Sequence, residues 1–392
     1  MGEAKKETEV EQVSEYRQEL IELREILLAN VVMAAEIPSP TFHEEGVVKF
    51  LFNRFNEAGL NNVSIDEAGN ATGFIPGTVG ERNILVAAHV DKIWEKKEDH
   101  TISVSADSMQ GRGVADNSLG VAVLATLPII LEKLDIELES NLILLGNTCS
   151  FGRGDLAGMR FFLENTKVGI DSALCLEGTQ LGRLSYSSMG MARGEIEVSV
   201  GEEPDVLQMD RSSAIGSLNK IINSILAIER PEKPRTAILL GSVEAGSGYN
   251  VPPTTGRLRF EIRSESADVV ARVQGEIQDI VEECRAMDQC EASLAILAQR
   301  SPGDIGFDHP LVRKARETLS ELGIKTKIAP SVSELSALLD KKIPALTLGL
   351  TKGDNRHAKN ESILIEPVFD GLAQLVSLLK FMDSSFDPTD EK

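Results

Sequence analysis

The residues of this 392-residue chain that could do chemistry stand beside short apolar runs and glycine-rich turns. His89 and Asp91 end the run NILVAAHVD, and Glu177 follows SALCL. Asp116 lies in GRGVADNSLG, and His357 lies in the polar stretch GDNRHAKNESI. Imidazole nitrogens and carboxylate oxygens are common zinc donors in proteins. If the fold brings these side chains together, they form a metal site in which Asp116 could bridge two ions roughly 3.5–4 Å apart.

Each of these residues also has an ordinary structural interpretation. His89 and Asp91 could be a surface pair, and Glu177 could be an exposed acid at a strand end. Asp116 could cap the helix that follows it, because Asp is a favoured N-cap residue. His357 could belong to a plain surface loop. Only their convergence on one point would favour the metal site over these alternatives.

The elements that must position these residues alternate between strands and helices. Strands are predicted at NILVAAHVD, SNLILLGNT and SALCLEG, and helices at ADNSLGVAVLATLPIILEKL and DLAGMRFFLEN. This alternation predicts an α/β fold with a mainly parallel sheet and helices on both faces. Ligands in such sheets gather at the carboxyl ends of the strands. His89, Cys149 and Glu177 all fall at such ends, which predicts a common site.

The flanking segments have their own patterns. Residues 12–34 have helical spacing, and NVSIDEAGNATGFIPG is typical of a hairpin. A helix is predicted to begin near Thr41, where Glu44 three residues later suggests a capping box. After residue 300 we predict helices near 309–322 and at SELSALLD, a strand at PALTLGL, and a closing helix.

Near residue 190 the order of predicted strands and helices changes, which predicts a second domain. ARGEIEVSV, TAILLGSVEAG, TGRLRFEIRSE and CEASLAILAQ read as strands, and two amphipathic helices lie between them. The resulting order, β-α-β-β-α-β, is that of a split βαβ sandwich. We therefore expect a domain over residues 190–300, inserted into a first domain formed by residues 1–189 and 301–392.

Composition narrows the range of partners and compartments. The formal net charge of −21 argues against a nucleic-acid partner and against anionic membranes. The N-terminal stretch lacks the apolar core of a signal peptide, and GVAVLATLPIIL is too short to span a bilayer. The four cysteines form no CxxC pair, which is typical of reduced thiols in a cytoplasmic protein.

In order and spacing, the motifs AHVD, GRGxxDN, LEG and the late histidine before NESI resemble a known family. This is the co-catalytic zinc peptidase family of tripeptidase T, the aminoacylases and the glutamate carboxypeptidases. The resemblance covers nearly the whole chain, and GYNVPPTTGRLRFEIRS is similar to a segment of the family's inserted domain. It implies that this domain is an α+β sandwich that serves as a lid or dimerisation domain, and hence a homodimer.

The resemblance also implies roles for individual residues. His89 and Glu177 would hold one zinc, Asp116 would bridge, and His357 would hold the other zinc. Asp91 would be the carboxylate behind His89. In the inserted domain, Asn250 and Arg263 would be substrate-binding residues.

The chain departs from the family where two consecutive glutamates are expected. Cys149 stands in the position of the general base, and Ser150 in the position of a zinc ligand. A thiol with an ordinary pKa of about 8.5 replaces a carboxylate base poorly, and a lost acid–base group costs about 10²–10⁴-fold in rate. Cys149 could instead be a thiolate ligand or a nucleophile with His357 as its base. The segment VGEEPDVLQMDRSSAIGSLNK also lacks the histidine that the family carries there.

These features predict a divergent zinc-peptidase-like hydrolase that cleaves an amide bond in a small peptide or an N-acyl amino acid. One Zn²⁺ should be well held and a second poorly held, with reduced activity. The alternative is a catalytically inactive homologue that acts as a ligand-binding or assembly protein.

Overall fold

The computed structural model describes residues 12–201, 213–249, 251, 253–288 and 290–384. The chain divides into two compact units, one formed by Met1–Ser187 with Asp304–Lys392 and the other by Ser188–Gly303. The short strands β9 (Ser187–Ser188) and β14 (Gly303–Asp304), which pair with each other, carry the two connections.

The first unit is built on an eight-stranded sheet with the strand order β1-β2-β6-β3-β7-β16-β8-β15. Its four central strands, β6, β3, β7 and β16, run parallel to their neighbours in this group. The central strands are β6 (Asn141–Asn147), β3 (Asn83–His89), β7 (Ser172–Glu177) and β16 (Ala345–Gly349). The outer strands are β1 (Asn61–Ile65), β2 (Ala71–Ile75), β8 (Arg183–Ser185) and β15 (Lys327–Ile328).

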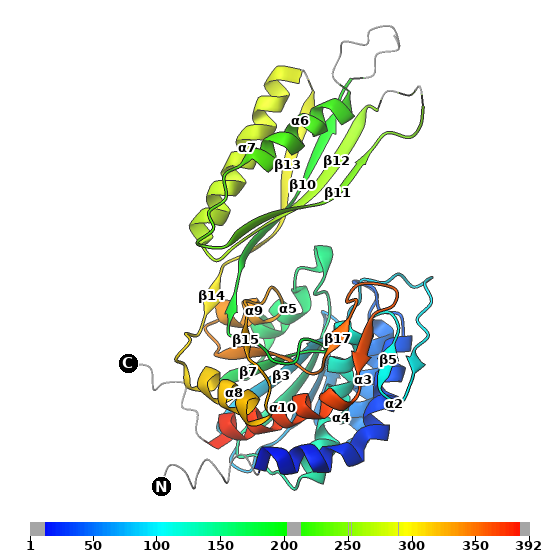
Figure 1. Cartoon of the computed structure of the whole chain (residues 1–392), viewed down its shortest axis with the longest axis vertical. Helices are drawn as coiled ribbons and strands as arrows, with labels where there is room; N and C mark the ends of the chain where they lie inside the picture. The colour runs from blue at the N-terminus through cyan, green and yellow to red at the C-terminus, as the bar shows by residue number, and fades with distance from the viewer. Residues whose placement is uncertain (1–11, 202–212, 250, 252, 289, 385–392) are drawn as a thin grey trace. The chain divides into compact units, whose positions relative to one another are not determined.

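Helices cover both faces of this sheet, which explains why its strands are continuously apolar. On β3, Ile84, Val86 and Ala88 face one core, whereas Leu85 and Ala87 face the other. The first core includes α2 (Arg24–Glu36), α3 (Glu45–Glu57), α4 (Leu119–Lys133), α8 (Pro310–Glu321) and α10 (Glu366–Ser384). The second core includes α5 (Ala157–Asn165) and α9 (Leu335–Asp340) (Figure 1).

Helix α4 with the turn before it, Val114–Lys133, is long and apolar enough to cross a membrane by composition. Its most apolar window is, however, 89% buried inside the protein. Its residues pack in the core together with α2 and β3, as expected of a central helix.

The first unit also contains a separate, four-stranded sheet. It runs β17-β18-β5-β4, with the bounds Gly353–Asp354, Ser362–Leu364, Ser108–Gln110 and Ser103–Val104. Pairing of β18 with β5 brings the segment around His357 next to the segment that leads to Asp116. Residues about 240 positions apart in the sequence thereby become neighbours.

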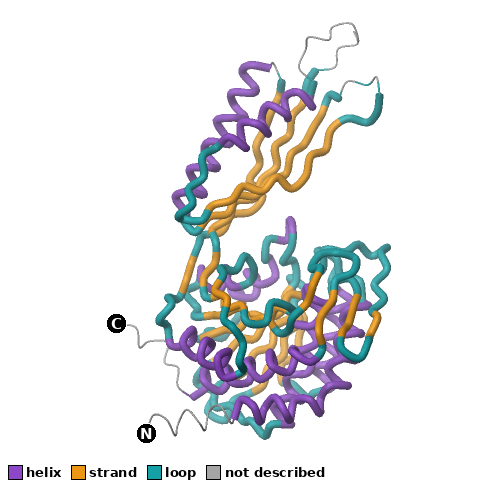
Figure 2. Tube along the Cα trace, in the orientation of Figure 1, coloured by secondary structure: helices purple, strands orange, loops and turns teal. Residues whose placement is uncertain are grey.

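The second unit is an antiparallel sheet with two helices on one face (Figure 2). Its strand order is β11-β12-β10-β13. In chain order the elements are β10 (Gly190–Ser199), α6 (Ala214–Ala227), β11 (Thr236–Ala245), β12 (Thr255–Ser264), α7 (Ala267–Asp288) and β13 (Glu291–Arg300). Alternate residues of each strand, such as Ile196 and Val198 on β10, pack against both helices. The predicted fold class, α/β with an inserted α+β sandwich, is confirmed.

The predicted capping box at Thr41 and Glu44 is wrong. Helix α3 begins at Glu45, and no side chain caps it. The hydroxyl of Thr41 instead donates to Asp91 Oδ2 at 2.8 Å, and Glu44 Oε1 accepts the main-chain N–H of Cys149 at 2.9 Å. The two residues therefore serve the candidate site rather than the helix start.

Candidate metal centre

The carboxyl ends of three neighbouring parallel strands form the base of the site. In the sheet β6 lies next to β3, and β3 next to β7. His89 ends β3 and Glu177 ends β7, while Cys149 and Ser150 follow the end of β6. The sheet therefore places these residues at one edge, as the pattern of strands predicts.

His89, Asp116 and Glu177 come together as a group of potential metal donors. One donor atom from each lies within 4.8 Å of the others, the only such group of three within the ranges that the structure describes. His89 Nε2 lies 3.1 Å from Asp116 Oδ1, and both side chains are almost completely buried. Three residues far apart in the sequence thus converge on one ion-sized point.

Two glycines allow the Asp116 segment to approach the sheet edge. Gly113 has a φ of +72°, a left-handed conformation that favours glycine. At Gly178, a Cβ atom would lie 2.3 Å from the carbonyl oxygen of Ala115. The LEG and GRG motifs are therefore explained by the close packing that positions Asp116 beside Glu177.

Asp116 itself is held by a buried carboxylate. Glu361, fully buried, accepts the main-chain N–H groups of Ala115 and Asp116 through Oε1, at 2.6 and 2.9 Å. Its Oε2 accepts the N–H of His357 at 3.1 Å. Asp116 does not cap helix α4, because the N-cap residue is Ser118 and no side chain accepts a capping hydrogen bond there. Glu361 thus fixes the Asp116 and His357 segments to each other.

His357 meets the second oxygen of Asp116. Its Nε2 lies 2.5 Å from Asp116 Oδ2, whereas His89 is on the Oδ1 side. The ring of Phe151 lies edge-on to both imidazoles, with centroids 5.0 Å from His89 and 6.3 Å from His357. One carboxylate therefore has an imidazole at each oxygen, the arrangement that a bridging ligand requires.

Asp91 lies behind His89, away from the nitrogen that faces Asp116. Its Oδ1 is 3.5 Å from His89 Nδ1, and its carbonyl oxygen is 3.1 Å from the same nitrogen. A hydrogen bond from Nδ1–H to that carbonyl leaves Nε2 with a lone pair for coordination. Asp91 Oδ2 accepts the main-chain N–H groups of Ser150 and Phe151, both at 2.9 Å. Asp91 therefore ties the loop after β6 to the end of β3.

Cys149 and Ser150 occupy the loop after β6, where the resemblance implies two glutamates. Burial, with the nearby charge of Glu44, raises the pKa of the Cys149 thiol to about 11. In the metal-free protein the thiol is therefore protonated near neutral pH, which disfavours Cys149 as a nucleophile. Ser150 Oγ donates to the Glu334 carboxylate at 2.5 Å.

Two charged residues that the sequence analysis did not identify belong to this site. Glu334 lies just before α9, and Arg356 precedes His357. Arg356 Nε donates to Asp116 Oδ2 at 2.9 Å, and its Nη2 to Glu177 Oε2 at 3.0 Å. The guanidinium thus pairs with both carboxylates of the donor group. In the sequence, the only indication of a role for Arg356 is its position next to His357, a candidate ligand. No feature of the sequence indicates a role for Glu334.

The electrostatics of the group follow from burial and pairing. Burial opposes charge on both His89 and Asp116, yet the hydrogen bonds of Asp116 with His357 and His89 hold the pKa of Asp116 well below its usual range. The pKa of His89 lies well above its usual value despite burial, through hydrogen bonds to Asp116 and Asp91. Burial raises the pKa of Glu177, against the attraction of Arg356. The centre is therefore a buried network of histidines and carboxylates, and a positive charge beside the carboxylates stabilises their ionised form.

The remaining predicted residues lie in the second unit. Arg263 is on β12, where its Nε donates to Glu261. Asn250 lies outside the described residues, as does most of the segment that lacks the family's histidine. The roles of Asn250 and Arg263 in substrate binding stay predictions.

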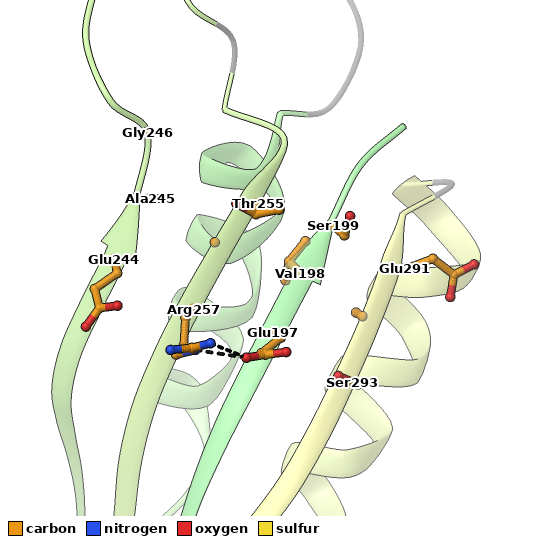
Figure 3. Close-up of a pocket in the computed structure, with 12 residues that line it drawn as sticks. Glu197, Val198, Ser199, Glu244, Ala245, Gly246, Thr255, Arg257, Glu291 and Ser293 are labelled. Carbon is orange, nitrogen blue, oxygen red and sulfur yellow. Dashed lines mark hydrogen bonds and ion pairs between the residues drawn. The ribbon is translucent and has the colours of Figure 1, made fainter. Parts of the chain in front are cut away.

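The second unit also has a hollow of about 670 Å³ on its sheet (Figure 3). Its lining comes from β10, β11, β12 and β13 and includes Arg257, Glu197 and Ser199. Arg257 is paired with Glu197 across the strands, at 2.5 Å. The lining residues include no His or Cys.

The donor set of the first unit fits a divalent metal ion. His89, Asp116 and Glu177 supply one imidazole nitrogen and two carboxylates, which suits zinc and related borderline metals. His357 adds a second imidazole on the other oxygen of Asp116. His89 Nε2 is oriented for coordination, because Nδ1 is engaged by Asp91.

Residues 85–380 match the model of a protein family described as Peptidase family M20/M25/M40. The chain belongs to this family. M20 membership confirms the resemblance noted in the sequence and makes the protein a metallopeptidase-like hydrolase.

Individual relatives of this M20 protein are distant in sequence but cover most of its length. A [LysW]-lysine/[LysW]-ornithine hydrolase from Saccharolobus islandicus is 23% identical over 341 residues, 86% of this chain and 90% of the relative. A tripeptidase from Staphylococcus aureus superposes with a TM-score of 0.74 at 17% identity, covering 92% and 98% of the two chains. A dinuclear metal binding M20 peptidase from Bacillus subtilis gives 0.65 at 16% identity, covering 92% and 98%. These solved structures share the fold.

Proposed function

We propose that the protein is a metal-dependent hydrolase that cleaves an amide bond in a small peptide or an N-acyl amino acid. The observation that carries this proposal is the convergence of His89, Asp116 and Glu177 within 4.8 Å in an M20 fold. A bound Zn²⁺ would supply Lewis acidity and an activated water. The three residues would hold the ion, and Asp91 would orient His89.

Activity is proposed to be lower than in a hydrolase with a carboxylate base. Cys149 stands where the base is expected, and its thiol has a pKa of about 11, raised by burial and by Glu44. A protonated thiol accepts a proton poorly near neutral pH, and the loss of a general base costs about 10²–10⁴-fold.

The relatives support a choice of substrate class. Their names describe hydrolysis of [LysW]-lysine or [LysW]-ornithine and of tripeptides. We infer that N-acyl-lysine, N-acyl-ornithine and short peptides are the substrates to test first.

Metal content and turnover together test this function. Protein loaded with Zn²⁺ or Mn²⁺ after chelation is assayed against the substrate panel, with His89→Ala as the test variant. His43→Ala is the matched control, because His43 is exposed. Metal retention and turnover should both be lost only in His89→Ala. Equal metal binding and turnover in the two variants would contradict the proposal.

A second candidate function is ligand binding without turnover. Arg356 bridges Asp116 and Glu177 and can act as the counter-cation of the site in place of a metal. This favours a homologue that binds a peptide or amino-acid ligand without cleaving it. Ligand-induced thermal shifts that persist in the presence of a chelator, with no turnover at any metal concentration, would support this candidate over the hydrolase.

We further propose a homodimer formed through the second unit. Strand β11 is an edge strand of its sheet, and Leu239 and Val243 on it are 56% and 53% exposed. Unpaired strand edges favour pairing with a second copy. Light scattering at micromolar concentration should give twice the mass of the chain, and Leu239→Lys should reduce it to that of a monomer. A monomeric wild type would contradict the dimer.

A cytoplasmic location is proposed from the cysteines. The four cysteines, all within the described residues, form no disulfide, although Cys284 Sγ and Cys290 Sγ lie only 3.9 Å apart. Cysteines that remain reduced suit a reducing compartment. Fractionation of cells that express the native chain tests this location, and recovery outside the cytoplasm would contradict it.

A further inference from the structure

Lys92 is a buried cation that the proposed function does not use. It directly follows Asp91 in the chain, and it is only 2% exposed. Lysine is almost never fully buried unless its charge is paired. In the part of the chain that the structure describes, however, no carboxylate forms an ion pair with Lys92.

The partners of the Lys92 ammonium are main-chain carbonyl oxygens at the end of α2. Nζ donates to the carbonyls of Ala34 and Ala35, each at 2.8 Å, and to that of Ile37 at 2.9 Å. An ammonium has three N–H donors, so all three are used. Ala34 and Ala35 lie in the last turn of α2, where carbonyls lack partners within the helix and carry the negative end of its dipole. Lys92 therefore caps α2 from the end of β3.

Keeping a charge at this position is costly. Burial lowers the pKa of Lys92 to about 7, while the charge of Glu361 raises it. A lowered pKa means that the charged form is less favourable in the folded protein than in water. An apolar side chain of similar length would fill the same space without that cost. The ammonium therefore does more than fill space, because it holds the end of α2 to the end of β3.

The main chain of Lys92 joins the same two segments. Its N–H donates to the carbonyl of Ser39 at 2.8 Å, and Pro40 pairs with Lys92 in an isolated bridge. The hydroxyl of Ser39 donates to the carbonyl of Val90 at 2.9 Å. The segment after α2 is thus bonded to the residues on both sides of Asp91.

This segment also reaches the side chain of Asp91. The hydroxyl of Thr41 donates to Asp91 Oδ2 at 2.8 Å. The carbonyl oxygen of Asp91 and its Oδ1 lie 3.1 and 3.5 Å from His89 Nδ1. Direct contacts therefore lead from the Lys92 ammonium, through the end of α2 and Thr41, to the residue that orients His89.

The stem of Lys92 packs against the turn that carries Asp116. A Cβ atom at Gly113 would lie 2.6 Å from Lys92 Cδ. The carbonyl of Gly113 accepts the N–H of Ser118 at 3.1 Å, which closes the turn around Asp116. Lys92 thus contacts the approach to Asp116 as well as the segment that fixes Asp91.

We propose that Lys92 is a positioning residue of the metal centre. Its ammonium holds the end of α2 so that Thr41 fixes Asp91, and its stem supports the turn that carries Asp116. The described contacts of Lys92 include no proposed ligand, so it acts on His89 and Asp116 through these intermediate groups. This inference rests on the proposed metal-dependent function.

The test compares metal binding in the wild type, Lys92→Met, Thr41→Val, the double variant of these two, and the control Lys96→Met. Met has an unbranched side chain of similar length, so it removes the charge of Lys92 with little change in packing. Lys96 is exposed and lies four residues further along the chain. Chelator-treated protein is titrated with Zn²⁺ in a calorimeter, and thermal unfolding without metal verifies that each variant folds.

Lys92→Met should bind Zn²⁺ about 10–100-fold more weakly than the wild type, the range for residues that orient a metal ligand. Thr41→Val should also weaken binding, and Lys96→Met should not. The double variant should lose no more than Lys92→Met alone, because both residues act along one path. Wild-type affinity in folded Lys92→Met would show that Lys92 only stabilises the helix end, and would overturn the inference. Additive losses in the double variant would overturn it too.

A spectroscopic readout separates positioning from stability. Co²⁺ can occupy sites that suit zinc, and its visible absorption depends on the type and geometry of its ligands. The absorption bands of Co²⁺-loaded Lys92→Met should be shifted, whereas those of Lys96→Met should match the wild type. Identical spectra in all three proteins would overturn the inference. If Lys92→Met fails to fold, Lys92→Gln takes its place in both measurements, because its amide keeps two N–H donors without the charge.

Failure of this inference is distinguishable from failure of the proposed function. A wild type that binds an ion, lost on His89→Ala but unaffected by Lys92→Met, retains the function and removes the role of Lys92. A wild type that binds no ion removes both.

Discussion

The two sides of the Asp116 carboxylate are built from different kinds of structure. On the Oδ1 side, His89 and Glu177 end adjacent parallel strands, so the hydrogen-bonded register of the sheet places them. On the Oδ2 side, His357 and Arg356 come from one loop. Strand register therefore places the residues of the first side, whereas those of the second side depend on the conformation of this loop.

The largest effect is expected from Asp116, which serves both sides. Asp116→Asn removes the charge that both imidazoles face, so binding of every ion should weaken by more than about 100-fold. Turnover should fall to background. Asp107→Asn, at an exposed position on the same approach to the site, is the control. Calorimetry and the substrate assay measure both effects, and retention of one tight ion would mean that the two sides do not share Asp116.

Introducing a carboxylate base into the loop after β6 should increase the rate of hydrolysis. Cys149→Glu places a carboxylate where the thiol stands, and the gain in turnover should be about 100-fold or more, since a positioned general base contributes about 10²–10⁴-fold. Cys149→Gln matches its length without the acid and should give no gain. Equal rates for the two variants would show that the activity of the native protein is not limited by a missing base at this position.

The Arg356 guanidinium, which pairs with Asp116 and Glu177, should compete with a metal ion for these two carboxylates. Arg356→Gln removes the partner of Asp116 and Glu177, which are otherwise buried. Because Arg356 is partly exposed, the pair is expected to contribute about 1–2 kcal/mol, so metal affinity should rise about 10-fold. The melting temperature of the metal-free protein should fall. An unchanged affinity would indicate that Arg356 moves aside at no cost when metal binds.

The smallest effect is a difference in the reactivity of one thiol. Cys149 is half-buried, whereas the other cysteines are buried, and its pKa is raised to about 11. Alkylation by iodoacetamide should therefore be slow at pH 7 and should increase about tenfold per pH unit up to about pH 10. Mass spectrometry of the labelled peptide measures the rate, with the unfolded chain as control. A pH-independent rate near neutrality would mean that the thiol is ionised there.

Much of the first side could be predicted from the sequence. Continuous apolar runs identify β3 and β7, and a parallel sheet brings His89 and Glu177 to one edge. The glycines of GRG and LEG indicate a close approach near Asp116. The second side depends on the loop of Arg356 and His357 and could not be predicted in the same way. Nor could Glu334, which reaches the site through the packing of α9 on the sheet, because no local pattern distinguishes it from a residue of an ordinary helix start.

Thr41 and Glu44 illustrate the same limit. Their spacing satisfies a local rule for a helix start, yet their side chains bond to Asp91 and Cys149, which are distant in the sequence. A local sequence pattern considers only hydrogen bonds between groups that are close in the sequence. Here the two side chains form hydrogen bonds with distant residues instead. Arg356 was missed because one cation in a polar loop has no feature that distinguishes it from a solvated residue.

The most direct test of the metal centre is anomalous diffraction from crystals grown with Zn²⁺. We predict a strong anomalous peak in contact with His89 Nε2, Asp116 and Glu177, with the Arg356 guanidinium displaced from the two carboxylates. No peak at this position, with Arg356 still bridging Asp116 and Glu177 in saturating zinc, would contradict a metal centre in this protein.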